Sequence, residues 1–169
     1  MLKKFIYILA AAVLAIAVTA CGASSGQHTG ENLEEGDMAP VFTAEMADGS
    51  TINIEDLQGK PVFVNFWATW CGYCVSEMPD LQKLYEEYGD DVQFIMIDCE
   101  ETTDEVNAFI SDNPYTFPYA YDTDGSISDL YPTQGIPLTA VIGKDGSVEK
   151  IFRGACPYEE YRAAIEGAL

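Results

Sequence analysis

The sequence is poor in basic residues and has a single histidine. Eight lysines and arginines stand against 28 aspartates and glutamates, for a formal net charge of −20. Nucleic-acid binding depends on neutralising phosphates with Lys and Arg, so we expect no nucleic-acid partner. The one histidine, His28, lies in a polar stretch near the N-terminus. This excludes a Cys–His nucleophile pair and a histidine-rich metal site in a folded domain, and we expect neither a metal nor a cofactor.

Cysteines are also few, at five in 169 residues. That number is too small for a disulfide scaffold, so a hydrophobic core must hold the fold together. Apolar residues make up 48% of the chain and aromatic residues 12%, which is ample for such a core. The length predicts one compact domain with an appendage, and the acidity is typical of a solvated surface.

The first twenty residues have the pattern of a targeting signal. Lys3 and Lys4 precede an apolar run and then the small residues before Cys21, as in a secretory signal. The junction resembles a bacterial lipobox, which predicts a signal peptide over 1–20, lipidation of Cys21 and a flexible, Gly- and Ser-rich linker over 21–35. An uncleaved membrane helix over residues 5–20 is the alternative. Both alternatives place the domain at 36–169 outside the cytoplasm.

The rest of the chain predicts an α/β domain. Residues 41–42 and 51–54 favour a β-hairpin around the turn 47–50, and the apolar runs 62–68 and 92–98 favour buried strands. Helical patterns follow each buried strand, the second opening with a capping box at Thr102 and Glu105. A hairpin over 138–152 and a helix that starts at Pro157 complete the pattern. We therefore expect one mixed sheet with helices on its faces.

The chemistry centres on Trp70-Cys71-Gly72-Tyr73-Cys74, directly after a buried strand and at a helix start. Free backbone N–H groups at that end stabilise a thiolate on the first cysteine, and the second lies one turn further on. This pattern predicts a redox-active disulfide in which Cys71 attacks and Cys74 resolves. A zinc half-site and two inert core cysteines are the alternatives.

Several segments carry a resemblance to a known family. The run from Phe66 to Cys74 resembles the active-site segment of thioredoxin-fold proteins, and Pro79 matches their helix-kinking proline. More narrowly, the chain is similar to the TlpA/ResA-type thiol–disulfide oxidoreductases. The features behind this similarity are Ala39-Pro40-Val41-Phe42, Asp48-Gly49, the run from Cys74 to Pro79, and an insert from Phe117 to Gly125. The resemblance implies a thioredoxin fold with an N-terminal β-hairpin and a central insert.

The resemblance also implies a substrate groove. Gly135-Ile136-Pro137-Leu138-Thr139 is similar to the loop whose proline is cis and faces the redox pair. A cis bond there would expose backbone groups beside Cys71 to an extended substrate chain; a trans, loop-stiffening proline is the alternative. The substrate-binding residues implied in this way are Trp70, Gly72, Tyr73, Ile136, Pro137, Gly154 and Ala155.

Asn65 and Glu77 bear on proton transfer. Thioredoxin itself has a buried aspartate where this chain has Asn65, and an amide cannot accept the proton of the second cysteine. Glu77 lies three residues beyond Cys74, on the same helical face, where TlpA/ResA-type proteins also have a glutamate. We expect Glu77 to serve as the acid/base, the alternative being an ordinary surface glutamate.

Two further cysteines follow predicted strands. Cys99 and Cys156 would lie about 14 Å apart, at three strand spacings, which argues against a disulfide between them. Cys156 precedes Pro157 where a helix cap is usual, so the helix end could favour its thiolate. For Cys99 we expect a quiet, buried thiol.

Together these features predict a thiol–disulfide oxidoreductase, lipid-anchored to the outside of the bacterial cell membrane, that reduces protein disulfides. The family resemblance suggests a CcdA- or DsbD-like membrane electron donor, and apocytochrome c or methionine sulfoxide reductase among the substrates. An oxidase or isomerase with the same dithiol is the nearest alternative. A peptide-binding module with structural cysteines belongs to a different class, and the segment lacks the Thr-x-x-Cys pattern of a peroxidase.

Overall fold

A computed structural model describes residues 33–169. The predicted signal peptide, Cys21 and most of the predicted linker lie outside the described residues. Within 33–169, no helix combines the length and the apolar character needed to cross a membrane.

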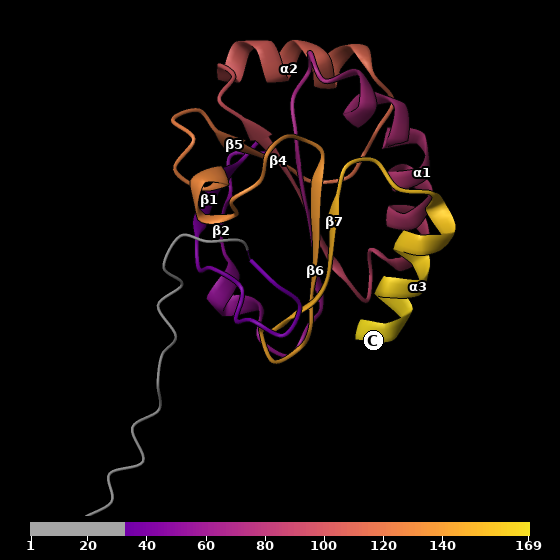
Figure 1. Cartoon of the computed structure of the whole chain (residues 1–169). Helices are drawn as coiled ribbons and strands as arrows, with labels where there is room; N and C mark the ends of the chain where they lie inside the picture. The colour runs from indigo at the N-terminus through magenta and orange to yellow at the C-terminus, as the bar shows by residue number, and fades with distance from the viewer. Residues whose placement is uncertain (1–32) are drawn as a thin grey trace, which may run out of the picture.

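Seven strands of the described chain form one mixed sheet in the order β2-β1-β5-β4-β3-β6-β7 (Figure 1). The parallel strands β3, β4 and β5 form its centre, and antiparallel hairpins extend it at both edges. The strands are β1 (Thr43–Met46), β2 (Thr51–Asn53), β3 (Val62–Trp67), β4 (Gln93–Cys99), β5 (Tyr119–Asp122), β6 (Leu138–Ile142) and β7 (Val148–Arg153). The α/β class, the thioredoxin fold and the N-terminal hairpin are thereby confirmed.

Three α-helices pack on the same face of the sheet, namely α1 (Gly72–Tyr88), α2 (Thr103–Asp112) and α3 (Tyr158–Ala168). Their apolar sides join one buried cluster that includes Phe63, Trp67 and Phe94. The opposite face is covered instead by the N-terminal segment around Leu33, by η1 (Ile54–Leu57) and by the loop that contains η2 (Ser128–Leu130). The α-helices of residues 33–169 therefore share one face: the crossovers β3–α1–β4 and β4–α2–β5 run the same way across the sheet, and α3 packs on that face after β7.

Three details of the sequence-based prediction were wrong. β1 spans Thr43–Met46 rather than residues 41–42, because its pairing with β2 begins at Thr43 and Asn53. The strand β5, inside the predicted central insert, was not predicted. It has only four residues and no apolar run marks it, because its structure depends on pairing with β4 and β1. Pro157 is the N-cap residue just before α3 instead of the first helical residue.

The strand β3 and the helix α1 position the redox pair. All six residues of β3 are buried, between β4 on one side and β6 on the other. The chain leaves this strand at Trp67, makes a short turn and enters α1 with Cys71 as the N-cap residue. The cysteines thus lie at the carboxyl end of β3, whose position is fixed by its neighbours β4 and β6.

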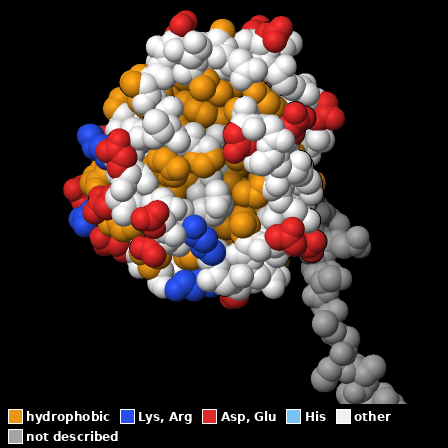
Figure 2. Space-filling view, turned by 180° about the vertical axis from the view of Figure 1, so that it is seen from behind, with side chains coloured by type: hydrophobic (Ala, Val, Ile, Leu, Met, Phe, Trp, Pro, Cys, Tyr) orange, Lys and Arg blue, Asp and Glu red, His pale blue; other side chains and the backbone are white. Residues whose placement is uncertain are grey.

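The surface is predominantly acidic, as the composition predicts. On the face seen in Figure 2, acidic side chains outnumber basic ones and apolar side chains gather near the middle. The ion pairs of Lys83, Lys150 and Arg162 are solvent-exposed, and such pairs contribute little stability. Stability therefore comes mainly from the two apolar clusters on either side of the sheet.

Candidate active site

Cys71 and Cys74 form a disulfide at the N-terminus of α1, with their Cα atoms 5.3 Å apart. The backbone N–H of Cys74 points at the sulfur of Cys71, 3.2 Å away. In the reduced protein the same N–H would stabilise a thiolate on Cys71, together with the helix dipole. The geometry thus suits Cys71 as the more acidic thiol of the pair.

Exposed residues surround the buried disulfide. Cys71 is 6% exposed and Cys74 only 1%. Trp70 and Tyr73, by contrast, are 72% and 77% exposed, and Gly72 between the cysteines is also exposed. Exposed residues thus flank a disulfide that is itself buried.

The peptide bond Ile136–Pro137 is cis, as predicted. The sulfur of Cys71 lies 3.7 Å from the carbonyl oxygen of Ile136, and the N–H of Gly154 donates to the carbonyl of Pro137 at 2.8 Å. The residues predicted from the two loops, Ile136–Pro137 and Gly154, therefore lie together beside the redox pair.

Two open hollows meet along the segment 133–136. One, of about 640 Å³, includes Trp70 and Ile136 in its lining, and the other, of about 510 Å³, includes Ile136 and Gly154. Ala155 is not among the residues that line either hollow. The hollows extend to both sides of Ile136, where an extended chain could lie against the exposed backbone.

Glu77 belongs to a closed ring of buried hydrogen bonds. The amide of Asn65 donates to Glu77 Oε1 at 3.1 Å and to the hydroxyl of Thr139 at 2.8 Å. Thr139 in turn donates to the hydroxyl of Tyr161 at 3.3 Å, and Tyr161 donates to Glu77 Oε2 at 2.9 Å. The backbone N–H of Cys156 also approaches Glu77 Oε2, at 3.4 Å. Residues from β3, α1, β6 and α3 thus form one hydrogen-bonded ring that includes the carboxyl group of Glu77.

The environment of Glu77 makes it a suitable acid/base. Its residue is only 5% exposed, and burial raises the pKa of Glu77 to about 7, although the hydrogen bonds from Tyr161, Asn65 and Cys156 act in the opposite direction. A group with a pKa near the working pH can both accept and release a proton. An ordinary surface glutamate is therefore excluded by the burial of this side chain.

Sequence reasoning missed Tyr161 and Thr139. Tyr161 lies one turn into a short amphipathic helix, where an aromatic residue is typical of the core, and its ring does pack on Phe63 and Phe152. Only the hydroxyl of Tyr161 distinguishes it from a purely apolar core residue. Thr139 belongs to the segment that resembles the proline loop, but nothing in the sequence says that it faces Asn65 across β3 and β6.

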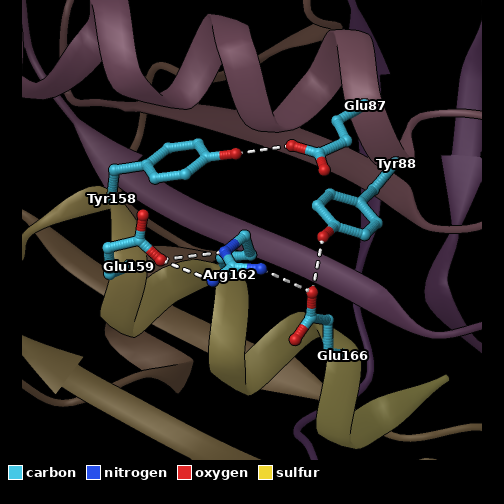
Figure 3. A network of polar contacts seen from close by, with 6 residues as sticks. All are labelled: Glu87, Tyr88, Tyr158, Glu159, Arg162 and Glu166. Atoms are coloured by element: carbon cyan, nitrogen blue, oxygen red, sulfur yellow. Dashed lines mark hydrogen bonds and ion pairs between the residues drawn. The ribbon is translucent and has the colours of Figure 1, made fainter.

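A second polar network, on the surface, ties α3 to α1 (Figure 3). Tyr158 donates to Glu87 at 2.5 Å, and Tyr88 donates to Glu166 at 2.9 Å. Arg162 joins Glu159 and Glu166 on the same side of α3. Since Glu77 is on α1 and Tyr161 on α3, these contacts help to hold the buried hydrogen bond between them.

The two other cysteines are free thiols, so the expectation of no Cys99–Cys156 disulfide is confirmed. The predicted activation of Cys156 was wrong. Pro157, not Cys156, is the N-cap residue of α3, and burial together with Glu160 and Glu77 raises the pKa of the Cys156 thiol to about 12. Burial and nearby carboxylates likewise raise the pKa of Cys99 to about 12, as expected of a quiet thiol.

Comparison with known proteins agrees with this geometry. Residues 35–151 match the model of the AhpC/TSA family. The chain is 39% identical over 139 residues to the thiol-disulfide oxidoreductase ResA of Oceanobacillus iheyensis, covering 79% of this chain and 70% of that protein.

Two solved structures are also similar. The secreted disulfide oxidoreductase of Mycobacterium tuberculosis that is homologous to E. coli DsbE superposes with a TM-score of 0.67 and 26% identity, over 75% of this chain and 95% of that one. The pneumococcal exposed lipoprotein thioredoxin of Streptococcus pneumoniae strain TIGR4 gives 0.69 and 25%, over 76% and 99%.

Proposed function

The chain belongs to the AhpC/TSA family and, within it, to the ResA-type thiol–disulfide oxidoreductases, and we propose that it works outside the cytoplasm as a reductase of protein disulfides. The observation behind this proposal is the Cys71–Cys74 disulfide, which caps α1 and faces the carbonyl of Ile136. That arrangement presents one sulfur to a substrate and keeps the other behind it.

The reaction takes two thiol–disulfide exchanges. The thiolate of reduced Cys71 attacks one sulfur of a substrate disulfide, forms a mixed disulfide and expels the other substrate sulfur as a thiolate. The thiolate of Cys74 then attacks the sulfur of Cys71, which releases the second substrate thiol and leaves the Cys71–Cys74 disulfide. Two electrons pass to the substrate, and its two sulfurs become thiols.

We assign to Glu77 the transfer of the proton that Cys74 loses in the second step. Cys74 is 1% exposed, so its thiol must lose a proton away from bulk water before it can attack. Glu77 follows one helical turn later, is buried, and has a pKa of about 7. In the proposed mechanism its carboxylate accepts the proton of Cys74, and it returns the proton when the site is reduced again.

Substrate binding is assigned to the exposed rim and the hollows beside the disulfide. Trp70, Gly72 and Tyr73 form the rim on the α1 side. On the other side, the backbone of Ile136 beside Pro137 and that of Ala155 beside Gly154 are proposed to bond an extended chain, while the Gly154 N–H and the Pro137 carbonyl hold the two loops together. We therefore expect binding to depend little on the sequence of the substrate, because every chain carries the same backbone groups.

The proposed location and partners rest on the relatives and on the N-terminal sequence. One similar structure is that of a secreted protein and another that of an exposed lipoprotein. Lipidation of Cys21 would hold this domain at the outer face of the membrane. A CcdA- or DsbD-like membrane protein would then supply electrons, and apocytochrome c or methionine sulfoxide reductase would be a substrate.

The redox potential tests the direction of electron flow. We expect the Cys71–Cys74 couple, equilibrated against glutathione, to lie nearer the about −270 mV of thioredoxin than the about −120 mV of DsbA. The reduced protein should also reduce insulin, and Cys71→Ser should abolish that activity. A potential near that of DsbA would instead support a disulfide oxidase or isomerase.

A further inference from the structure

A pair of buried acidic residues, Asp98 and Glu101, lies behind the turn that leads into Cys71. Asp98 is at the end of β4 and is fully buried, and Glu101, three residues later, is only 9% exposed. Neither belongs to the hydrogen-bond ring around Glu77. Carboxylates are rarely buried without a partner, so the pair needs an explanation of its own.

Glu101 holds the turn between β3 and α1. One of its carboxylate oxygens accepts the backbone N–H of Thr69 and the other accepts the hydroxyl of the same residue, each at 2.5 Å. Thr69 lies two residues before Cys71, and the N–H of Cys71 closes the turn on the carbonyl of Ala68 at 3.1 Å. A single carboxylate thus fixes both the backbone and the side chain of the residue in the middle of this turn.

Asp98 holds Glu101 in turn. Its Oδ2 accepts the backbone N–H of Glu101 at 3.2 Å, whereas its Oδ1 is buried with no hydrogen-bond partner within residues 33–169. An ionised Asp98 would leave charge on that oxygen next to Glu101. Burial and the neighbouring carboxylate of Glu101 raise the pKa of Asp98 to about 8, with a smaller effect from Asp122, although the backbone N–H of Glu101 acts in the opposite direction.

Asp98 consequently holds its proton more tightly than an ordinary aspartate does. Asp122, the other carboxylate that acts on Asp98, is held by the backbone N–H groups of Ile127 and Ser128. A metal does not explain the cluster, because no three His, Cys, Asp or Glu residues in the described part of the chain are arranged to hold one. What Glu101 does contact is Thr69.

We propose that Glu101, supported by Asp98, is a positioning residue of the redox site: it holds Thr69, and thereby keeps Cys71 in the orientation in which its sulfur accepts the N–H of Cys74. The inference rests on the proposed role of Cys71 as the attacking thiol. Release of Thr69 loosens the turn and weakens the bond between the Cys71 sulfur and the helix end. The thiolate of Cys71 is then less stable, and Cys71 reacts more slowly at neutral pH.

The sign of this effect separates positioning from simple electrostatics. A negative charge near Cys71 disfavours its thiolate, so neutralising Glu101 would by charge alone lower the pKa of Cys71 and speed its reaction. Loss of positioning does the opposite. Glu101→Gln keeps the shape of the side chain but cannot accept two hydrogen bonds from Thr69 on two separate carboxylate oxygens.

The experiment measures how fast iodoacetamide alkylates the reduced, full-length protein from pH 5 to 9, with tandem mass spectrometry to identify the alkylated cysteine. We expect Glu101→Gln to slow alkylation of Cys71 at pH 7 about fivefold, which corresponds to the ~1 kcal/mol of a lost N-cap hydrogen bond. Thr69→Val should act in the same direction and add nothing to Glu101→Gln. Asp98→Asn mimics the protonated acid and should leave the rate within about twofold, since its carbonyl can still accept the Glu101 N–H.

The control is Asp104→Asn, which removes a charge from an exposed residue of the same segment and should leave the rate of Cys71 unchanged. Thermal unfolding of each variant shows whether the fold survives. An unchanged or faster reaction of Cys71 in both Glu101→Gln and Thr69→Val, whatever their melting temperatures, would overturn the inference. Alkylation of Cys74 ahead of Cys71 in the wild type would instead contradict the proposed function.

Discussion

Tyr161→Phe tests whether the buried ring sets the proton affinity of Glu77. The hydroxyl of Tyr161 donates to Glu77 Oε2 at 2.9 Å and favours its ionised form. A hydrogen bond to a charged group contributes roughly 1.5 to 3 kcal/mol. Since 1.36 kcal/mol corresponds to one pKa unit, its loss should raise the pKa of Glu77 from about 7 to roughly 8 to 9.

The raised pKa has a direct effect on the rate. At pH 7 about half of the wild-type Glu77 is ionised, against roughly a tenth to a hundredth in Tyr161→Phe. If the carboxylate accepts the proton of Cys74, reduction at pH 7 should slow about 5- to 50-fold and recover near pH 9. The fold should survive, because the phenylalanine ring keeps the contacts with Phe63 and Phe152.

The assay is the rate of disulfide reduction by the reduced protein from pH 6 to 9.5, combined with a ¹³C NMR titration of the Glu77 carboxyl. Tyr158→Phe is the matched control, because it removes a hydroxyl-to-carboxylate bond from the same helix at the exposed Glu87 (Figure 3). A Glu77 midpoint that is unchanged or lowered in Tyr161→Phe would refute the reasoning. An equal loss of rate in Tyr158→Phe would show that the coupling of the helices, rather than the proton, is what matters.

Four further predictions follow from the same site and from the N-terminus. Glu77→Gln should slow reduction by roughly 10²-fold near neutral pH, as loss of a general acid/base typically does; an unchanged pH profile would remove Glu77 from the mechanism. Cys74→Ser should accumulate a mixed disulfide between Cys71 and its substrate, visible on non-reducing gels, whereas normal turnover would reverse the assignment of the two thiols. Because burial raises the pKa of Glu77 from 4.5 to about 7, the folded protein binds more protons than the unfolded chain between these values. The oxidised protein should therefore lose up to about 3 kcal/mol of stability as pH rises through that window, and Glu77→Gln should flatten the urea-unfolding profile. Mass spectrometry of the membrane fraction should find an acylated chain that begins at Cys21, and an intact, unacylated chain would contradict the lipid anchor.

Much of the fold could be read from local sequence. The run Val62–Trp67 is a buried strand because five of its six residues are apolar, and α2 begins where Thr102 and Glu105 form the predicted capping box. The two cysteines at a helix start also needed no tertiary information, since the end of a helix alone makes a thiolate favourable. These features depend on residues close together in the chain, where composition and periodicity determine the structure.

The partners of the catalytic groups were decided by the tertiary structure. Spacing along one helix indicates that Glu77 follows Cys74, but its raised pKa arises from burial among β3, β6 and α3. Tyr161 is 84 residues from Glu77 in the chain, and Glu101 is 32 residues from Thr69. The unpredicted strand β5 and the wrongly predicted activation of Cys156 show the same limit of local sequence patterns. Hydrogen bonding and desolvation depend on which groups the fold brings within about 3 Å of one another, and no local pattern of residues contains that information.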